Sequence, residues 1–217
     1  MDRYLSTVEP FKRLPAAERN RLAEASQEKR YAKGETVFRE GAASDSIWVV
    51  KTGRVHLMKF MADGKASTTC VMTNGEMFCC LPALDRKAYP VDAIAAEDTV
   101  LVRIPSDAFH HAMSRSPGFT EQTLCMFCDR LRQVEHKSCA IYEPAEQRLA
   151  QVLLGLAKKF GSTIPLTRHE LAEIAGTTHE TAIRILSRFG TQGVVRSVRG
   201  KITILAPEKL SALAGNS

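Results

Sequence analysis

Two helix-start signals flank Gly176 and restrict the fold of the last third of this 217-residue chain. Thr167 and Glu170 have the spacing of a capping box, in which each side chain accepts a hydrogen bond from the other residue's free backbone N–H. A second box of the same kind is predicted over Thr177–Glu180. A glycine between the two ends the first helix, because glycine adopts a positive φ at little cost. Two short helices joined by a tight turn are typical of a helix-turn-helix.

The second of these helices is predicted to run to about Phe189, with Gly190 as its stop, and to carry base-reading side chains. In a helix-turn-helix, the first turns of the second helix lie in the major groove of DNA. Glu180 and Arg184 are four residues apart and therefore share one face. A guanidinium donates two hydrogen bonds to guanine, and a carboxylate accepts one from a cytosine amine. The alternative for this pair is a surface ion pair, which its place at the helix start disfavours.

Residues 194–205 are predicted to form a hairpin that turns at Arg199-Gly200 and completes a winged helix. Its cations would contact DNA phosphates, and such contacts make affinity fall steeply with salt. The residues predicted to contact DNA are Thr167, Arg168, Thr178, His179, Glu180, Ile183, Arg184, Arg188, Arg199 and Lys201.

The distribution of charge agrees with a separate DNA-binding module. Residues 145–217 contain 10 Lys and Arg against 5 Asp and Glu, whereas residues 1–144 contain 20 against 19. Nearly all of the formal net charge of +6 therefore lies in the last third of the chain. This asymmetry is typical of a nucleic-acid-binding module joined to a neutral domain.

The segment from Tyr31 to about Ile104 has the pattern of an antiparallel β-sandwich or jelly-roll barrel. Short β-branched and aromatic runs alternate with turns predicted at Gly34, Gly41 and Gly53 and at the dipeptides Asp63-Gly64 and Asn74-Gly75. Both dipeptides favour tight hairpins. Regular strands at this spacing are typical of sandwiches and barrels.

Helical segments are predicted on both sides of this sheet. Residues 14–30 have helical composition, and residues 145–160 form an amphipathic pattern that ends at Gly161. The side chains expected on the buried face of the first helix are Leu14, Leu22 and Ala25.

Residues from about Pro117 to Tyr142 are predicted to form one long helix with an apolar seam. Its side chains recur at alternating steps of three and four residues, the a and d positions of a heptad repeat. We interpret the seam as a homodimer interface, although a lone amphipathic helix could equally pack on its own domain. Pro144 then marks a hinge into the last third. The seam residues are Leu124, Phe127, Leu131, Val134, Ser138 and Ile141.

This layout resembles the Crp/Fnr superfamily of bacterial transcription regulators over nearly the whole chain. The most specific segment is Leu166–Leu186, which is similar to the family's helix-turn-helix signature and ends in its Glu-Thr-x-x-Arg core. The resemblance implies an α+β fold with a cyclic-nucleotide-binding-type jelly roll, a dimerisation helix and a winged helix. The implied domains are residues 1–116, 117–143 and 144–217.

The resemblance also implies how the protein reads DNA. Glu180 and Arg184 would read a TGA-type half-site in an inverted repeat of double-stranded DNA, with RNA polymerase as a further partner. The nucleotide-responsive branch usually has Arg directly before this Glu, where the present sequence has His179.

The sensory segment departs from the members that bind cyclic AMP. Gly75-Glu76 is similar to the start of their phosphate-binding cassette, in which the Glu holds a ribose hydroxyl. The Arg-Ser or Arg-Thr pair that clamps the cyclic phosphate falls on Tyr89-Pro90. Tyrosine supplies no charged fork, and proline has neither a hydroxyl nor an N–H donor. Tyr-Pro is instead similar to the branch that senses nitrogen oxides, oxygen or redox state.

The cofactor of such a sensor stays open at this point. The Gly75–Cys79 stretch also looks like the carbon-monoxide-sensing haem members, in which a Cys there ligates haem, but Leu81 replaces the expected His. No cysteine precedes Cys70, which disfavours an N-terminal iron–sulfur cluster. Haem and cofactor-free thiol sensing are both retained, and no metal ligand is assigned.

The six cysteines are too few for a disulfide scaffold in a chain of this length. Cys125 and Cys128 form a CxxC pair that is predicted to begin the long helix, where the helix dipole lowers a thiol pKa. In the architecture that the resemblance implies, these two thiols and the adjacent Cys79 and Cys80 could meet at the effector pocket. The alternative is that the thiols only pack as small hydrophobes.

Together these features predict a cytoplasmic, homodimeric, sequence-specific transcription regulator that responds to a redox, gas or small-molecule signal. No apolar run approaches the ~20 residues of a membrane span. No nucleophile elbow, phosphate loop, zinc-protease motif or dinucleotide fingerprint predicts an enzyme. Two alternatives are a ligand-binding module that acts through protein partners and a cyclic-nucleotide-responsive regulator with an atypical phosphate cassette.

Overall fold

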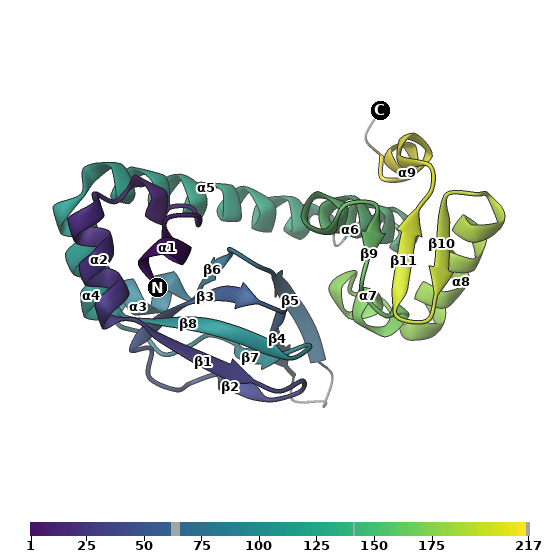
Figure 1. Cartoon of the computed structure of the whole chain (residues 1–217). Helices are drawn as coiled ribbons and strands as arrows, with labels where there is room; N and C mark the ends of the chain where they lie inside the picture. Colours follow the sequence, from purple (N-terminus) through teal and green to yellow (C-terminus); the bar gives the residue numbers. More distant parts are fainter. Residues whose placement is uncertain (62–65, 141, 216–217) are drawn as a thin grey trace. The chain divides into compact units, whose positions relative to one another are not determined.

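The computed structural model describes residues 1–61, 66–140 and 142–215 (Figure 1). The chain divides into two compact units. The first contains residues 1–132 apart from 66–68, and the second contains residues 133–217 together with 66–68. Each unit is described by itself below. Among the described residues, no helix is both long enough and apolar enough to cross a membrane.

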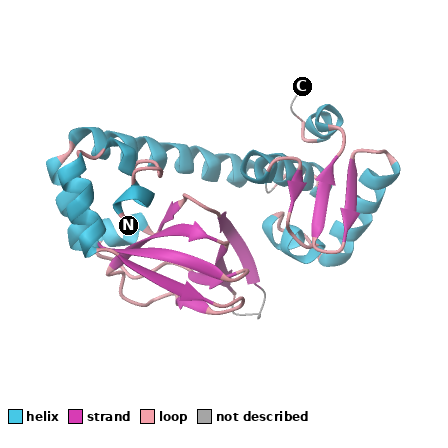
Figure 2. Ribbon diagram, viewed as in Figure 1, coloured by secondary structure: helices cyan, strands magenta, loops and turns pink. Residues whose placement is uncertain are grey.

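Two four-stranded sheets form the centre of the first unit (Figure 2). One sheet has the order β1-β8-β3-β6, with strands at Gln27–Tyr31, Thr99–Pro105, Ser46–Thr52 and Met77–Phe78. The other has the order β2-β7-β4-β5, with strands at Thr36–Phe38, Asp92–Ala95, Val55–Phe60 and Ala66–Met72. The described pairings are antiparallel, for example β3 with β8 and β4 with β7. The jelly-roll sandwich predicted from the turn spacing is confirmed.

Strand β3 is buried on both faces, which explains its unbroken apolar run Ile47-Trp48-Val49-Val50. Side chains of successive strand residues point to opposite faces of a sheet. Ile47 and Val49 accordingly belong to the core beneath the helices, whereas Trp48 and Val50 belong to the core between the two sheets. Burial on both faces yields a continuous apolar run rather than an alternating one.

One predicted turn glycine is fixed by a close approach of two chain segments. Gly53 has φ +90°, and a Cβ at this position would lie 2.5 Å from Thr99 Oγ1 and 2.7 Å from Asp98 O. Any other residue would therefore push β8 away from the turn between β3 and β4. The neighbouring predicted turns at Gly34, Gly41 and Gly75 also have positive φ. Gly64 lies outside the described residues.

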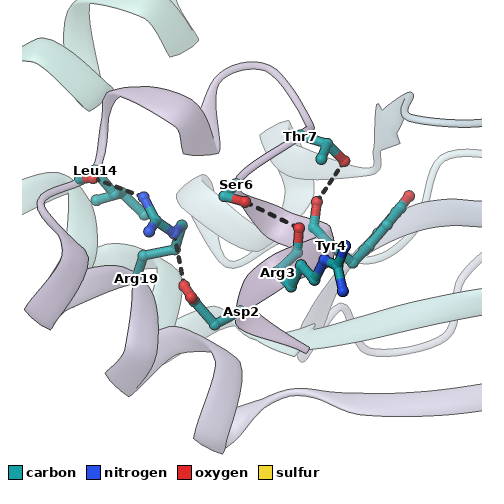
Figure 3. Close-up of polar contacts among 7 residues, drawn as sticks. All are labelled: Asp2, Arg3, Tyr4, Ser6, Thr7, Leu14 and Arg19. Atoms are coloured by element: carbon teal, nitrogen blue, oxygen red, sulfur yellow. Dashed lines mark hydrogen bonds and ion pairs between the residues drawn. The ribbon is translucent and has the colours of Figure 1, made fainter.

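The helices of the first unit pack on the β1-β8-β3-β6 sheet side of the core. They are α1 Asp2–Leu5, the 3₁₀ turn η1 Phe11–Arg13, α2 Ala16–Ala25, α3 Cys80–Asp85, α4 Ser106–Arg115 and the start of α5 Pro117–Ala140. Figure 3 shows how the chain start is fastened to α2: Arg19 donates hydrogen bonds to Asp2 Oδ1 at 2.6 Å and to Leu14 O at 3.3 Å.

The predicted helix over residues 14–30 is wrong at its C-terminal end. Helix α2 stops at Ala25, and Gln27–Tyr31 form strand β1, which pairs with β8 over five residues. Leu14 and Leu22 are buried as predicted, but Ala25 is exposed. The reason is that pairing with a neighbouring strand outweighs the helical composition of this polar segment.

Residues 142–215 of the second unit form four helices and three strands around one core, and the strands make a sheet of order β10-β11-β9. Its elements are α6 Ala145–Phe160, β9 Thr163–Ile164, α7 Arg168–Ile174, α8 His179–Thr191, β10 Val195–Val198, β11 Lys201–Ile204 and α9 Pro207–Leu213. The helix predicted over residues 145–160 and the hairpin turning at Arg199-Gly200 are confirmed. Strand β9 and helix α9 were not predicted.

Candidate nucleic-acid interface and sensory site

The first capping box forms as predicted. The Glu170 amide donates to Thr167 Oγ1 at 3.2 Å, and the Thr167 amide donates to Glu170 Oε2 at 2.6 Å. Gly176 follows the helix with φ +59°, the left-handed conformation expected of a helix stop. The start and the end of α7 are therefore set by local sequence.

The second helix start lies one residue later than predicted. Thr178, not Thr177, caps α8, because its Oγ1 accepts the Thr181 amide at 3.2 Å. The predicted box over Thr177–Glu180 is wrong: Glu180 occupies the second helical position and does not close a reciprocal box. The pKa of this carboxyl is lowered by a backbone N–H hydrogen bond and by the Thr178 hydroxyl. It is therefore an ionised acceptor at neutral pH.

Helix α8 also extends past the predicted stop. Gly190 lies inside the helix, which ends at Thr191, and Gly193 supplies the positive φ instead. Strand β10 of the wing begins at Val195, so the longer helix leaves only residues 192–194 as a connection.

The base-reading pair predicted from sequence lies on the open face of α8. Glu180 and Arg184 are exposed and Ile183 is half-buried, whereas Ala182, Ile185, Leu186 and Phe189 face the core. Arg184 makes no hydrogen bond or ion pair with any residue in the described part of the chain. The surface ion pair that the sequence left as an alternative does not form. The Glu180 carboxylate and the Arg184 guanidinium are therefore available to an external partner.

The remaining predicted DNA contacts divide into two places. Arg168 at the start of α7 donates to Ser197 Oγ of β10 at 3.0 Å, which ties this cation to the wing, and Arg199 and Lys201 are exposed at its tip. Arg188 lies at the other end of α8, where its guanidinium forms an ion pair with Glu146 of α6. Arg188 is thus engaged within the unit, and the structure does not group it with the cations at the wing.

Sequence reasoning missed Arg148, whose guanidinium holds the helix-turn-helix against the chain that precedes α6. It donates to Ala175 O at 3.0 Å, to Gly176 O at 2.9 Å and to Glu143 O at 2.7 Å. The first two carbonyls belong to the turn between α7 and α8. No local pattern signals these contacts, because the partners lie 27 and 28 residues along the chain.

Replacing Arg148 with methionine is expected to loosen this turn. Hydrogen bonds from a charged donor contribute about 1.5–3 kcal/mol each, and methionine keeps most of the apolar stem without the donors. Amide hydrogen exchange at Thr177, whose N–H donates to Ala172 O, should accelerate by about tenfold or more. Arg196→Met is the matched control, since Arg196 is exposed on β10. Equal exchange rates in both variants would contradict the assigned role.

The predicted seam of α5 is an apolar stripe that the first unit leaves uncovered. Leu124, Leu131 and Val134 are 53%, 60% and 57% exposed, whereas Phe119 and Thr123 on the opposite face are buried. Phe127 is half-buried and packs against the core of its own unit. The side chain of Ser138 and the whole of Ile141 lie outside the described residues.

At the expected effector site, Tyr89 fills the core rather than lining an open pocket. Its side chain is 3% exposed and stacks on Phe38 with ring centroids 3.8 Å apart. Its hydroxyl accepts from Trp48 Nε1 at 3.2 Å and donates to Ser46 O at 3.1 Å. Pro90, the second residue of the predicted pair, is exposed. Aromatic packing therefore occupies the position at which the resemblance implied a phosphate clamp.

The carboxylate of Glu76 is used within its own turn. Its Oε2 accepts from the Thr73 amide at 2.7 Å and from the Thr73 hydroxyl at 2.9 Å. Gly75 has φ +79°, and its amide donates to Val50 O at 2.8 Å. These contacts fasten the turn to strand β3.

The adjacent thiols of Cys79 and Cys80 are buried and protonated at neutral pH. Burial raises the pKa of Cys79 far above its ordinary range and that of Cys80 to about 12, which the nearby Arg130 guanidinium only partly offsets. Arg130 reaches them from α5 and donates to Met77 O at 2.9 Å. Cys79 adopts the left-handed conformation, with φ 57°, which is costly for a residue other than glycine.

The predicted CxxC pair does not begin a helix. Helix α5 starts at Pro117, so Cys125 and Cys128 lie in its interior, where both are exposed and the N-terminal dipole has faded. In the described part of the chain, no group of three or more His, Cys, Asp or Glu side chains could hold a metal ion. The structure thus does not bring the four predicted thiols into one cluster.

The residues near Cys79 do not fit haem. The thiol is enclosed in the aromatic core with Phe38, Phe78 and Tyr89, and Leu81, which replaces the expected His, carries no nitrogen and is 62% exposed.

Two family profiles match the chain. The profile of the cyclic nucleotide-binding domain matches residues 28–116, and that of the Crp-like helix-turn-helix domain matches residues 147–213. Together they cover most of both compact units.

Curated relatives extend the similarity to nearly full length. The chain is 28% identical to the Cyclic AMP receptor protein of Thermus thermophilus over 190 residues, which cover 87% of this chain and 88% of the relative. It is 26% identical to the Transcriptional activator protein FnrA of Stutzerimonas stutzeri over 194 residues, which cover 85% and 79%. Among solved structures, FixK2 from Bradyrhizobium japonicum has a TM-score of 0.79 at 23% identity and covers 87% of this chain and 96% of that one. At this identity, the structural match indicates a shared fold.

Proposed function

Since this chain belongs to the Crp/Fnr family of DNA-binding transcription regulators, we propose that it binds an inverted-repeat operator as a homodimer and answers a signal other than cyclic AMP. The observation that carries the DNA-binding half is Arg184 beside Glu180 on the first turns of α8, exposed and without a partner among the described residues. Those turns are the part of a helix-turn-helix that meets base edges.

Base recognition would use charges of opposite sign on neighbouring positions. Arg184 donates to guanine O6 and N7, and the ionised Glu180 accepts from a cytosine amine. Arg199 and Lys201 at the wing tip supply phosphate contacts, which position the protein without reading sequence. The net charge of +5 after Pro144 favours DNA over a protein partner for this unit.

The aromatic filling of the sensory unit supports the second half of the proposal. A cyclic phosphate needs a charged donor, and the expected position holds a buried, fully hydrogen-bonded tyrosine. The carboxylate of Glu76, which would hold the ribose, already accepts hydrogen bonds from the Thr73 amide and hydroxyl. We infer that the signal is a redox change, a gas or another small molecule; contact with RNA polymerase stays a prediction.

A regulator that responds to cyclic AMP is the second candidate, and the similarity to the Cyclic AMP receptor protein of Thermus thermophilus favours it. One experiment separates the two. The purified protein selects binding sites from random duplexes with and without cyclic AMP, and the affinity for the selected operator is then measured. We expect an inverted repeat whose half-sites are about 10 base pairs apart, and an affinity that cyclic AMP leaves unchanged.

Two outcomes count against the proposal. Selection of no sequence at all would refute specific DNA reading. A severalfold tightening of operator binding by cyclic AMP would instead favour the second candidate, and would require Tyr89 to leave the core.

A further inference from the structure

A basic hollow of about 350 Å³ lies where helices α7 and α8 begin beside the wing. It is lined by Thr167, Arg168, His169, His179, Val198, Arg199 and Gly200. Every ionisable side chain in this lining is basic or a histidine. Such a concave, positively charged surface attracts an anion.

Two histidines face each other in this hollow. The rings of His169 and His179 meet edge to face, with centroids 5.5 Å apart and an interplanar angle of 88°. Both residues are exposed, so this contact is not part of the hydrophobic core. They come from the first turns of the two helices of the helix-turn-helix.

Charged groups of both signs lie around the pair. Arg168 from α7 and Arg199 from the wing line the hollow. Glu173 Oε1 lies 3.4 Å from His169 Nε2, and Glu180 follows His179 in the chain. Glu170 also belongs to α7, but its carboxylate is hydrogen-bonded to the Thr167 amide. A negative group that enters the hollow would favour the charged form of an imidazole in contact with it.

We propose that the hollow binds one phosphate of the operator backbone and that the His169–His179 pair takes up a proton when this phosphate enters. The inference rests on the proposed DNA-binding function and adds a proton-dependent contact to it. An imidazolium donates a stronger, charge-assisted hydrogen bond to a phosphate oxygen than a neutral ring does. Because proton uptake and DNA binding are linked, a lower pH tightens the complex. Since the rings are in contact, mutual repulsion limits uptake to one proton for each pair.

The test is the affinity for the selected operator between about pH 6 and about pH 8, the interval in which histidine changes its charge. Fluorescence anisotropy is measured at constant ionic strength in the presence of EDTA, so that neither salt nor a stray metal contributes. For the wild type, we expect the dissociation constant to fall by up to about tenfold per pH unit per protomer as the pH is lowered. The double variant His169→Gln/His179→Gln should bind with a dissociation constant that changes less than twofold over the whole range.

Matched variants locate the effect. His111→Gln removes an exposed histidine of the first unit and should leave the pH dependence of the wild type intact. Each single variant, His169→Gln or His179→Gln, should keep a pH dependence of at most one proton per protomer, because the remaining ring can still take up the proton. Glutamine keeps a neutral hydrogen-bonding side chain at both exposed positions, so the fold is retained.

Two results would overturn the inference: a wild-type affinity that does not change with pH, or an unchanged pH dependence in the double variant. Failure of the proposed function is distinguishable from both, because the wild type would then bind no operator at any pH.

Discussion

Alanine in place of Arg184 should weaken binding to the selected operator by about 30-fold or more, since each protomer of the homodimer loses a bidentate contact to guanine that contributes about 1–3 kcal/mol. The free protein should lose no stability, because the guanidinium is exposed and has no partner within the described residues. Competition binding against operators altered at the contacted base measures the effect. For the variant, the preference for guanine at that position should disappear.

Salt dependence separates this base contact from a phosphate contact. The slope of log affinity against log salt counts the phosphates that the protein neutralises. Arg184→Ala should leave this slope nearly unchanged, whereas Arg199→Ala should reduce it by about two, one for each protomer, and weaken all sequences alike. Arg39→Ala, an exposed cation of the sensory unit, serves as the control. A variant at Arg184 that still discriminates between bases as the wild type does would contradict the assigned readout.

Features fixed by neighbouring residues could be predicted from the sequence. The Thr167–Glu170 box and the Gly176 stop act over a few residues, and both form as expected. Where two adjacent residues could both cap a helix, the local pattern predicted the wrong one. Both Thr177 and Thr178 can cap a helix, and Thr178 is the one that the turn after Gly176 leaves extended.

Contacts between distant segments could not be predicted in this way. Tyr89 was expected to line a pocket, but its stacking on Phe38 and its hydrogen bond with Trp48 join three separate strands or loops. The three donations of Arg148 span up to 28 residues and follow no periodicity. The strand at Gln27–Tyr31 has a helical composition that its pairing with β8 overrides. In each case, a contact with a residue that is distant in the sequence determines the structural role.

The double variant Leu124→Glu/Leu131→Glu is expected to separate the homodimer into folded monomers. These two side chains are 53% and 60% exposed in the single chain. Replacing them should therefore change the free energy of unfolding of the monomer little. Burial of a leucine against a partner helix contributes about 1.5–3 kcal/mol, and each substitution acts twice in a symmetric dimer. The glutamates also place like charges opposite each other along the seam.

Loss of the dimer should also abolish tight operator binding. A dimer engages two half-sites at once, so the second contact benefits from a high effective concentration that a monomer lacks. We expect the variant to bind the inverted repeat at least about 100-fold more weakly and a single half-site about as well as the wild type does. Phe127 is left unchanged because it packs in the core of its own unit, and its loss would confuse unfolding with dissociation.

Analytical ultracentrifugation distinguishes the two states by mass, since one chain has a mass of 24.0 kDa and the wild type should sediment at twice this value. Arg132→Glu adds the same charge to the same helix at a position that is paired with Asp129 rather than part of the stripe, and should remain a dimer. A double variant that still sediments as a dimer would show that Leu124 and Leu131 do not form the interface. In that case, their exposure would need a different partner, and the inverted repeat would need a different source of symmetry.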